Sequence, residues 1–220
     1  LLTCEMGTSE VCHLTSGAGR VLTQAATKIG DAIAAGSFAS NDAFQTAFDA
    51  ARDGGRVHIV GLASDGGVHA DVRHLRALID AAAAAGVEAV THAITDGRDV
   101  APQSAEGFMA RLEAGLPEGA RVVTVTGCFY AMDRDTRWER VAEAYAAMAC
   151  AEAPRRAESG VAAVRAGYDE GLTDEFLKPT VTGTPAPMRD GDGLFCLNFR
   201  ADRAREILRA LGEPGFDAFD

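Results

Sequence analysis

The sequence predicts an α/β fold in which a mostly parallel sheet carries helices on both faces. Short apolar runs of strand length alternate with longer segments whose apolar residues recur at helical spacing. Turns rich in glycine and aspartate separate them. Strands that alternate with helices pair in parallel, because each helix returns the chain to the same end of the sheet.

Strands and helices follow one another along most of the chain. The expected strands are Arg56–Ala63, Val87–Ile94, Arg121–Thr126 and Gly193–Phe199. The expected helices are Val21–Ala35, Asn41–Arg52, Asp71–Ala85, Ser104–Gly115, Trp138–Ala151, Glu158–Gly171 and Ala201–Leu211. Proline and glycine in Leu172–Asp192 predict a long irregular connection.

Composition narrows the class of protein. The chain is 47% hydrophobic and 24% charged, as in ordinary globular proteins, and no apolar stretch is long enough to span a membrane. A net charge of -11 argues against a nucleic-acid partner. Leu1 in place of an initiator methionine suggests a piece of a longer protein.

Cysteine usage indicates the compartment. Five scattered cysteines without a CxxC spacing argue against a disulfide framework and fit the cytoplasm, where we expect the protein. Cys4, Cys12 and His13 leave open half of a metal site, although three ordinary side chains are the favoured interpretation.

Polar and charged residues follow each predicted strand. Because the carboxyl ends of parallel strands meet at one edge, these residues should lie close together. The edge gathers His69, Arg98, Arg134, Arg200 and Arg203, with Asp65, Asp96, Asp99 and Asp133 between them. Individually, such a histidine could be structural, and Arg203 could lie on a solvated helix face. Together they predict a site for a small anionic molecule rich in oxygen, since guanidinium groups match phosphate and carboxylate.

Five motifs resemble one enzyme family. They are MGTSEVCHLTSGAGR, GLASDGGVH, TDGRD, YAMDRDTRWERV and NFRADRAR. In order and spacing they resemble the cofactor-independent (2,3-bisphosphoglycerate-independent) phosphoglycerate mutases, over nearly the whole chain but less than half of a family member. The resemblance implies a phosphotransferase domain inserted in a metal-binding domain of the alkaline-phosphatase type. Residues 1–20 would then be the nucleophile-bearing edge of the metal-binding domain, and residues 21–220 the substrate-binding domain.

The resemblance also implies residue roles. Ser9 would be the nucleophile that accepts the phosphoryl group beside a metal ion, although Thr8 or Ser9 could instead cap a helix. Asp99 would move a proton between the 2- and 3-hydroxyls of glycerate. The implied substrate contacts are His69, Arg98, Asp99, Arg134, Arg200 and Arg203.

Some family features are absent from the sequence. The family has arginine where this chain has Cys128 and glycine where it has Cys12, and Lys178 does not match the family lysine that lies beyond the insert. The family's two manganese ions, or similar divalent ions, are bound mainly by residues outside this segment. We therefore expect this chain alone to bind no metal and to lack mutase activity.

Interconversion of 2- and 3-phosphoglycerate in glycolysis and gluconeogenesis, through a phosphoserine intermediate, is the leading functional hypothesis. A non-catalytic module that binds phosphate esters is one alternative. Another is a related metal-dependent phosphotransferase of the alkaline-phosphatase superfamily. The oligomeric state is left open by the sequence.

Overall fold

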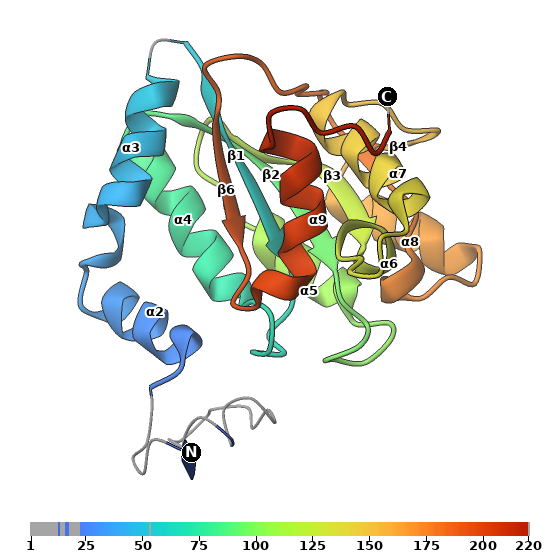
Figure 1. The fold of residues 1–220 in the computed structure, drawn as a ribbon, viewed down its shortest axis with the longest axis horizontal. Coiled ribbons are helices and arrows are strands. Elements are labelled where there is room, and N and C mark those ends of the chain that lie inside the picture. The colour runs from blue at the N-terminus through green and yellow to red at the C-terminus, as the bar shows by residue number, and fades with distance from the viewer. Residues whose placement is uncertain (1–12, 14–15, 18–22, 53, 220) are drawn as a thin grey trace.

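The predicted parallel sheet is present. The computed structural model describes residues 13, 16–17, 23–52 and 54–219 (Figure 1). Six strands lie in the order β4-β5-β3-β2-β1-β6. The strands that pair in parallel, as predicted, are β1 (Arg56–Leu62), β2 (Glu88–Thr95), β3 (Ala120–Gly127) and β6 (Gly193–Leu197).

Two short strands at one side of the sheet correct the prediction. The stretch Leu172–Asp192 is not wholly irregular, because it contains the 3-10 helix η2 (Asp174–Phe176) and β5 (Thr180–Thr182). β5 pairs antiparallel with β3 and parallel with β4 (Arg155–Ala157). Three residues are too few to show alternation in the sequence, so these strands depend on pairing with distant segments.

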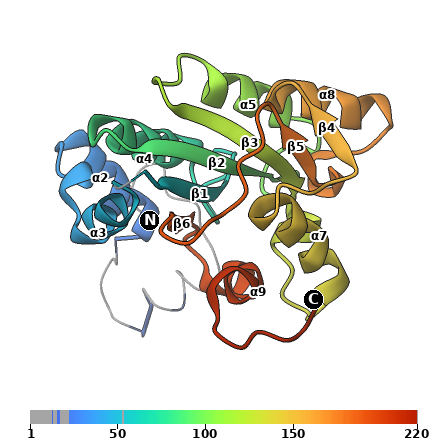
Figure 2. The same ribbon diagram turned by 90° about the horizontal axis from the view of Figure 1, so that it is seen from above.

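Helices cover both faces of the sheet, as predicted (Figure 2). One face carries α3 (Asp42–Ala51), α4 (Val72–Ala84), α5 (Ala105–Glu113) and α8 (Gly160–Asp169), with α2 (Ala25–Ala34) and the 3-10 helix η1 (Phe38–Ser40) beside them. The other face carries α7 (Trp138–Ala149) and α9 (Ala201–Gly212), and α6 (Cys128–Ala131) packs into the same apolar cluster. None of the helices in the described residues has the length and apolar character needed to cross a membrane.

A separate apolar cluster fills the space on each side of the sheet. Leu78 and Met109 are fully buried in the first cluster, and Val141 and Met148 in the second. Burying each such side chain stabilises the fold by about 1.5–3 kcal/mol. Side chains of Asn41, Asp71 and Ser159 accept hydrogen bonds from backbone N–H groups at the starts of α3, α4 and α8.

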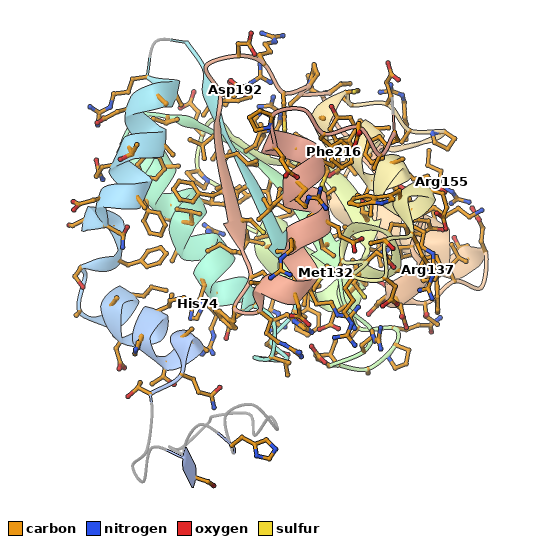
Figure 3. All side chains as sticks on the ribbon, viewed as in Figure 1. His74, Met132, Arg137, Arg155, Asp192 and Phe216 are labelled. Atoms are coloured by element: carbon orange, nitrogen blue, oxygen red, sulfur yellow. The ribbon has the colours of Figure 1, made fainter. Side chains whose placement is uncertain are left out.

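The four parallel strands all end at the same edge, which lies at the bottom in Figure 1. The loops after β1, β2, β3 and β6 leave from this edge, whereas Asp192, labelled in Figure 3, lies at the opposite edge. The common edge predicted for the polar loops is therefore confirmed.

Candidate anion-binding site at the carboxyl edge of the sheet

Asp96, directly after β2, organises the loop that carries Arg98 and Asp99. Its side chain is buried, and Oδ1 accepts hydrogen bonds from the backbone N–H groups of Arg98 and Asp99, both at 3.0 Å. Oδ2 accepts a hydrogen bond of 2.7 Å from the Ser64 hydroxyl. Asp96 therefore connects the loop after β1 to the loop after β2. It also fixes the backbone at Arg98 and Asp99, the two functional candidates.

The loop after β1 approaches Asp99 so closely that a side chain would not fit. A Cβ atom added to Gly66 would lie 2.8 Å from Cβ of Asp99 and 3.4 Å from Oδ2 of Asp96. The next glycine, Gly67, has a φ of 69°, a conformation that favours glycine. The two glycines thus let the chain turn while bringing His69 against Asp99.

His69 and Asp99 form the centre of this edge. Nε2 of His69 lies 3.6 Å from Oδ2 of Asp99, which is longer than a hydrogen bond. Among the described residues, His69 Nδ1 and Asp99 Oδ2 are buried without a hydrogen-bond partner. Both side chains thus retain hydrogen-bonding capacity for a ligand.

Burial controls the protonation of this pair. Burial lowers the pKa of His69, and the charges of Arg200 and Arg203 add to this effect while Asp99 opposes it. Burial, helped by Asp96, raises the pKa of Asp99, against the effect of His69. A carboxyl group whose pKa is raised takes up a proton more readily, which suits a group that accepts and donates one.

Arg200 joins the pair from β6. The backbone N–H of Phe199 donates a 2.6 Å hydrogen bond to the carbonyl oxygen of His69. Arg200 follows immediately and donates its backbone N–H to Oδ1 of Asn198 at 3.0 Å. Its guanidinium group lies 3.3 Å from Asp202. The loop after β6 is thus attached to the loop after β1.

Five other arginines, among them Arg98, Arg134 and Arg203, line a cavity of about 300 Å³ next to this pair. Burial, together with the charges of Arg134 and Arg98, lowers the pKa of Arg203, which indicates that the three cations lie close to one another. The cavity is lined by Arg98, Cys128, Phe129, Met132, Asp133, Arg134, Asp135, Arg137, Arg140, Glu175, Phe176 and Arg203. Met132 and Arg137 are labelled in Figure 3.

Within the described residues, a single contact holds each of the guanidinium groups of Arg98, Arg134 and Arg203. Arg203 donates to the carbonyl oxygen of Met132 at 3.2 Å, and Arg134 donates to Asp202 at 3.0 Å. Arg98 lies 3.5 Å from Oε1 of Glu175. Because a guanidinium group has five N–H donors, contacts within the described chain leave most donors for water or a ligand.

Comparison with known proteins gives the family. The sequence model described as "BPG-independent PGAM N-terminus (iPGM_N)" matches residues 29–220. The chain belongs to this family. A relative named 2,3-bisphosphoglycerate-independent phosphoglycerate mutase, from Dinoroseobacter shibae, is 59% identical over 217 residues, covering 98% of the chain and 43% of that relative.

Two further relatives carry the same name. The Ruegeria pomeroyi protein is 55% identical over 217 residues, covering 98% of the chain and 43% of that relative. The Natronomonas pharaonis protein is 55% identical over 213 residues, covering 95% of the chain and 42% of that relative. The chain thus spans less than half the length of the curated relatives in the iPGM_N family.

The structure brings most of the residues expected from the mutase resemblance to one edge. His69, Asp99 and Arg200 form one group, and Arg98, Arg134 and Arg203 form the adjacent cavity. Asp65 does not line the cavity; it is half exposed and pairs with Arg111 of α5 at 3.5 Å. Ser9, Cys4 and Cys12 lie outside the described residues.

Two cavity arginines were missed by the sequence analysis. Arg137 contacts Asp135 at 3.2 Å, and Arg140 lies over the ring of Phe129 at 3.8 Å from its centroid. With Arg134 they recur at every third residue in DRDTRWER, although only Arg140 lies within α7. That spacing is the sequence signal from which Arg137 and Arg140 could have been predicted.

Cys128 is a neutral side chain beside these cations. It is buried, and its thiol donates to the carbonyl oxygen of Asp96 at 3.2 Å. Burial, together with the charges of Asp96 and Glu175, raises the pKa of Cys128 to about 12. The thiol therefore stays protonated at neutral pH and contributes no charge to the cavity.

Proposed function

We propose that this chain is the phosphoglycerate-binding part of a 2,3-bisphosphoglycerate-independent phosphoglycerate mutase, which interconverts 2- and 3-phosphoglycerate in the cytoplasm. The observation that carries the proposal is the arginine-lined cavity next to His69 and Asp99. The names of the relatives favour this function over a non-catalytic binding module or another phosphotransferase.

The charge of the cavity suits such a ligand. Five arginines line it together with the three carboxylates Asp133, Asp135 and Glu175, so positive charge is in excess. A phosphate ester carries about 1.5 to 2 negative charges near neutrality, and the glycerate carboxylate adds one. A cavity of about 300 Å³ lies at the small end of ligand sites, as a three-carbon metabolite requires.

The proposed roles follow from the geometry. Arg98, Arg134 and Arg203 hold the anionic groups, and Arg200 contributes its charge near His69. His69 contacts the phosphoryl group through a ring nitrogen. Asp99, whose pKa is raised, moves a proton between the two glycerate hydroxyls. Ser9 accepts the phosphoryl group in this proposal.

In this proposal, the metal ions are bound mainly by residues outside this segment. Two divalent ions such as Mn²⁺ would activate a serine hydroxyl, which is otherwise a weak nucleophile. Within the described part of the chain no cluster of three or more histidine, cysteine, aspartate or glutamate side chains fits a metal ion. We propose that residues 1–220 alone bind ligand without turnover.

Calorimetric titration with 3-phosphoglycerate tests the proposed function. Arg200→Ala and Arg203→Ala should each weaken binding about ten- to hundredfold, because each removes a charge-assisted hydrogen bond. Arg205→Ala is the matched control, since Arg205 is exposed on the same helix and lines a different cavity. Glycerate and inorganic phosphate should bind more weakly than the ester. Unchanged affinity in both Arg200→Ala and Arg203→Ala would refute the assignment.

A second prediction concerns Cys128. Cys128→Arg should tighten 3-phosphoglycerate binding, by about tenfold if one charge-assisted bond is gained. The thiol lines the cavity and is neutral, so an arginine there adds a cation without removing an existing one. Calorimetry at low salt measures the change, with Cys150→Arg as the exposed control. An affinity that stays constant or falls would mean that this cavity wall does not face the ligand.

A further inference from the structure

Two buried carboxyl groups meet at the wall of the arginine cavity. Asp133 follows α6 and is 5% exposed, and Glu206 on α9 is 7% exposed. The two side chains interact directly, and Oε2 of Glu206 is buried without a hydrogen-bond partner among the described residues. Two ionised carboxylates cannot hydrogen-bond to each other, because neither has a hydrogen to donate, so that buried oxygen is satisfied by Asp133 only when one of the two groups carries a proton.

The donors and cations around the pair indicate that Glu206, and not Asp133, carries the proton. Oδ2 of Asp133 accepts hydrogen bonds from the backbone N–H groups of Asp135 and Arg137, at 2.9 and 3.0 Å. Its Oδ1 lies 3.6 Å from Arg140 and 3.7 Å from Arg137. These donors and cations favour the ionised form of Asp133. Burial raises the pKa of Glu206, and the nearby charge of Asp133 adds to the effect.

The same pair joins two segments that carry cavity arginines. The backbone N–H of Thr136 donates to Oε1 of Glu206 at 3.0 Å. Thr136 has a φ of 57°, a strained conformation for threonine that needs support from its surroundings. The loop that holds Arg134 is thus attached to α9 one turn after Arg203.

We propose that protonated Glu206 is a positioning residue for the anion site, forming with Asp133 a proton-dependent clamp that holds the loop of Arg134 against the helix of Arg203. Loss of the proton places two negative charges against each other in a buried position. The clamp then loosens, and the arginines no longer converge on one ligand. The choice of 3-phosphoglycerate as ligand rests on the proposed function, whereas the proton shared by Glu206 and Asp133 does not.

The charged groups that face the pair determine the direction of the effect. Asp135, on the same loop as Asp133, disfavours a charge on Glu206. Arg137 and Arg140, at the start of α7, stabilise the charge on Asp133. A higher pH therefore removes the proton from Glu206 and leaves Asp133 as it is.

Glu206→Gln provides the decisive variant. A glutamine amide can donate to Asp133 and accept from Thr136 without a titrating proton, so the clamp persists at all pH values. We expect both forms to bind 3-phosphoglycerate equally at a pH below the raised pKa of Glu206. As pH rises through that pKa, wild-type affinity should fall relative to Glu206→Gln, by up to about tenfold per pH unit for one proton. Ionisation of the ligand and of His69 is common to both forms and cancels in the ratio.

An unfolding measurement tests the shared proton without a ligand. The folded-state pKa of Glu206 is raised, so its contribution to stability is present at low pH and lost as pH rises through that pKa. The urea midpoint of wild type should therefore fall relative to Glu206→Gln over the same pH range. Glu213→Gln, an exposed carboxylate after α9, should follow wild type in both measurements.

The two measurements separate the possible failures. Parallel unfolding profiles for wild type and Glu206→Gln would mean that no proton is shared, which would overturn the proposal. A proton-dependent midpoint with parallel binding profiles would also overturn it, because the clamp would not position the arginines. If wild type fails to bind 3-phosphoglycerate, the proposed function fails, and the binding comparison is made with inorganic phosphate.

Discussion

Replacing Asp174 with alanine should lower the free energy of unfolding by about 3–5 kcal/mol, the largest effect expected for a single side chain here. Asp174 is fully buried, and its Oδ2 accepts hydrogen bonds from the backbone N–H groups of Ser104 and Ala105, both at 2.9 Å. The Ser104 hydroxyl and the Tyr168 hydroxyl also donate to this carboxylate. Alanine would leave the Ser104 N–H and the Tyr168 hydroxyl without this acceptor, whereas the Ala105 N–H keeps its bond to Tyr168 and the Ser104 hydroxyl its bond to Ala101, and each lost bond costs free energy.

The effect should reach the anion site. Asp174 precedes Glu175, which contacts Arg98, and a Cβ atom on Gly97 would lie 2.9 Å from Cβ of Asp174. Urea unfolding at pH 7 measures the stability change, with the exposed Asp190→Ala as control. Asp174→Asn, which retains an acceptor oxygen, should cost less than alanine. A loss below about 1 kcal/mol for alanine would mean that water replaces the carboxylate.

Acidification should destabilise the protein through two buried histidines. Nε2 of His58 lies 3.1 Å from Asp192, and Nδ1 of His58 lies 2.9 Å from Nε2 of His92. Nδ1 of His92 lies 3.0 Å from the Thr124 hydroxyl. With Thr124 donating to His92, His92 to His58 and His58 to Asp192, every ring nitrogen is used while both rings stay neutral. An added proton would break this chain of hydrogen bonds.

The sign of the pH dependence follows from the direction of the pKa shifts. Burial lowers the pKa of His58, and burial helped by His58 lowers the pKa of His92 to about 3. The unfolded chain therefore binds these protons first as pH falls below the ordinary value of about 6.5. Stability should be complete above that value and decline by about 1.4 kcal/mol per pH unit for each proton.

Urea unfolding between about pH 7 and pH 4 measures this decline, within the range where histidine titrates in the unfolded chain. His92→Gln removes one titrating group and should reduce the slope, whereas the exposed His13→Gln should keep the wild-type slope. NMR titration of the His92 ring protons is independent of unfolding. If the ring titrates near pH 6.5 in the folded protein, or if His92→Gln keeps the full slope, the account of this network is wrong.

Sequence patterns were sufficient for the elements that are long and regular. The four parallel strands are apolar runs of five to eight residues, and the helices between them show clear apolar spacing. β4, β5 and the four-residue α6 were not predicted, because elements of three or four residues have no measurable period. Their positions depend on contacts made across the chain, such as the pairing of Thr180 and Val181 with β3.

Most of the site residues could be predicted from the ends of the strands, but the contacts and burial that determine their chemistry could not. The sequence placed His69 and Asp99 at one edge, whereas their 3.6 Å separation and buried surroundings required the fold. The sequence also suggested Asp65 for this edge, where it instead pairs with Arg111. The contact between Asp133 and Glu206 has no local signal, because the two residues lie on segments far apart in the chain.

The central claim is that 3-phosphoglycerate binds in the arginine cavity at the carboxyl edge of the sheet. NMR spectra of the arginine Nε–Hε groups, recorded as 3-phosphoglycerate is added, test it directly because each guanidinium group reports separately. The account predicts saturable shifts for Arg98, Arg134, Arg200 and Arg203. Arg155 and Arg156, which line a separate cavity of about 540 Å³ with Lys178, should not shift. Shifts confined to Arg155 and Arg156, with the other four unchanged, would contradict the account.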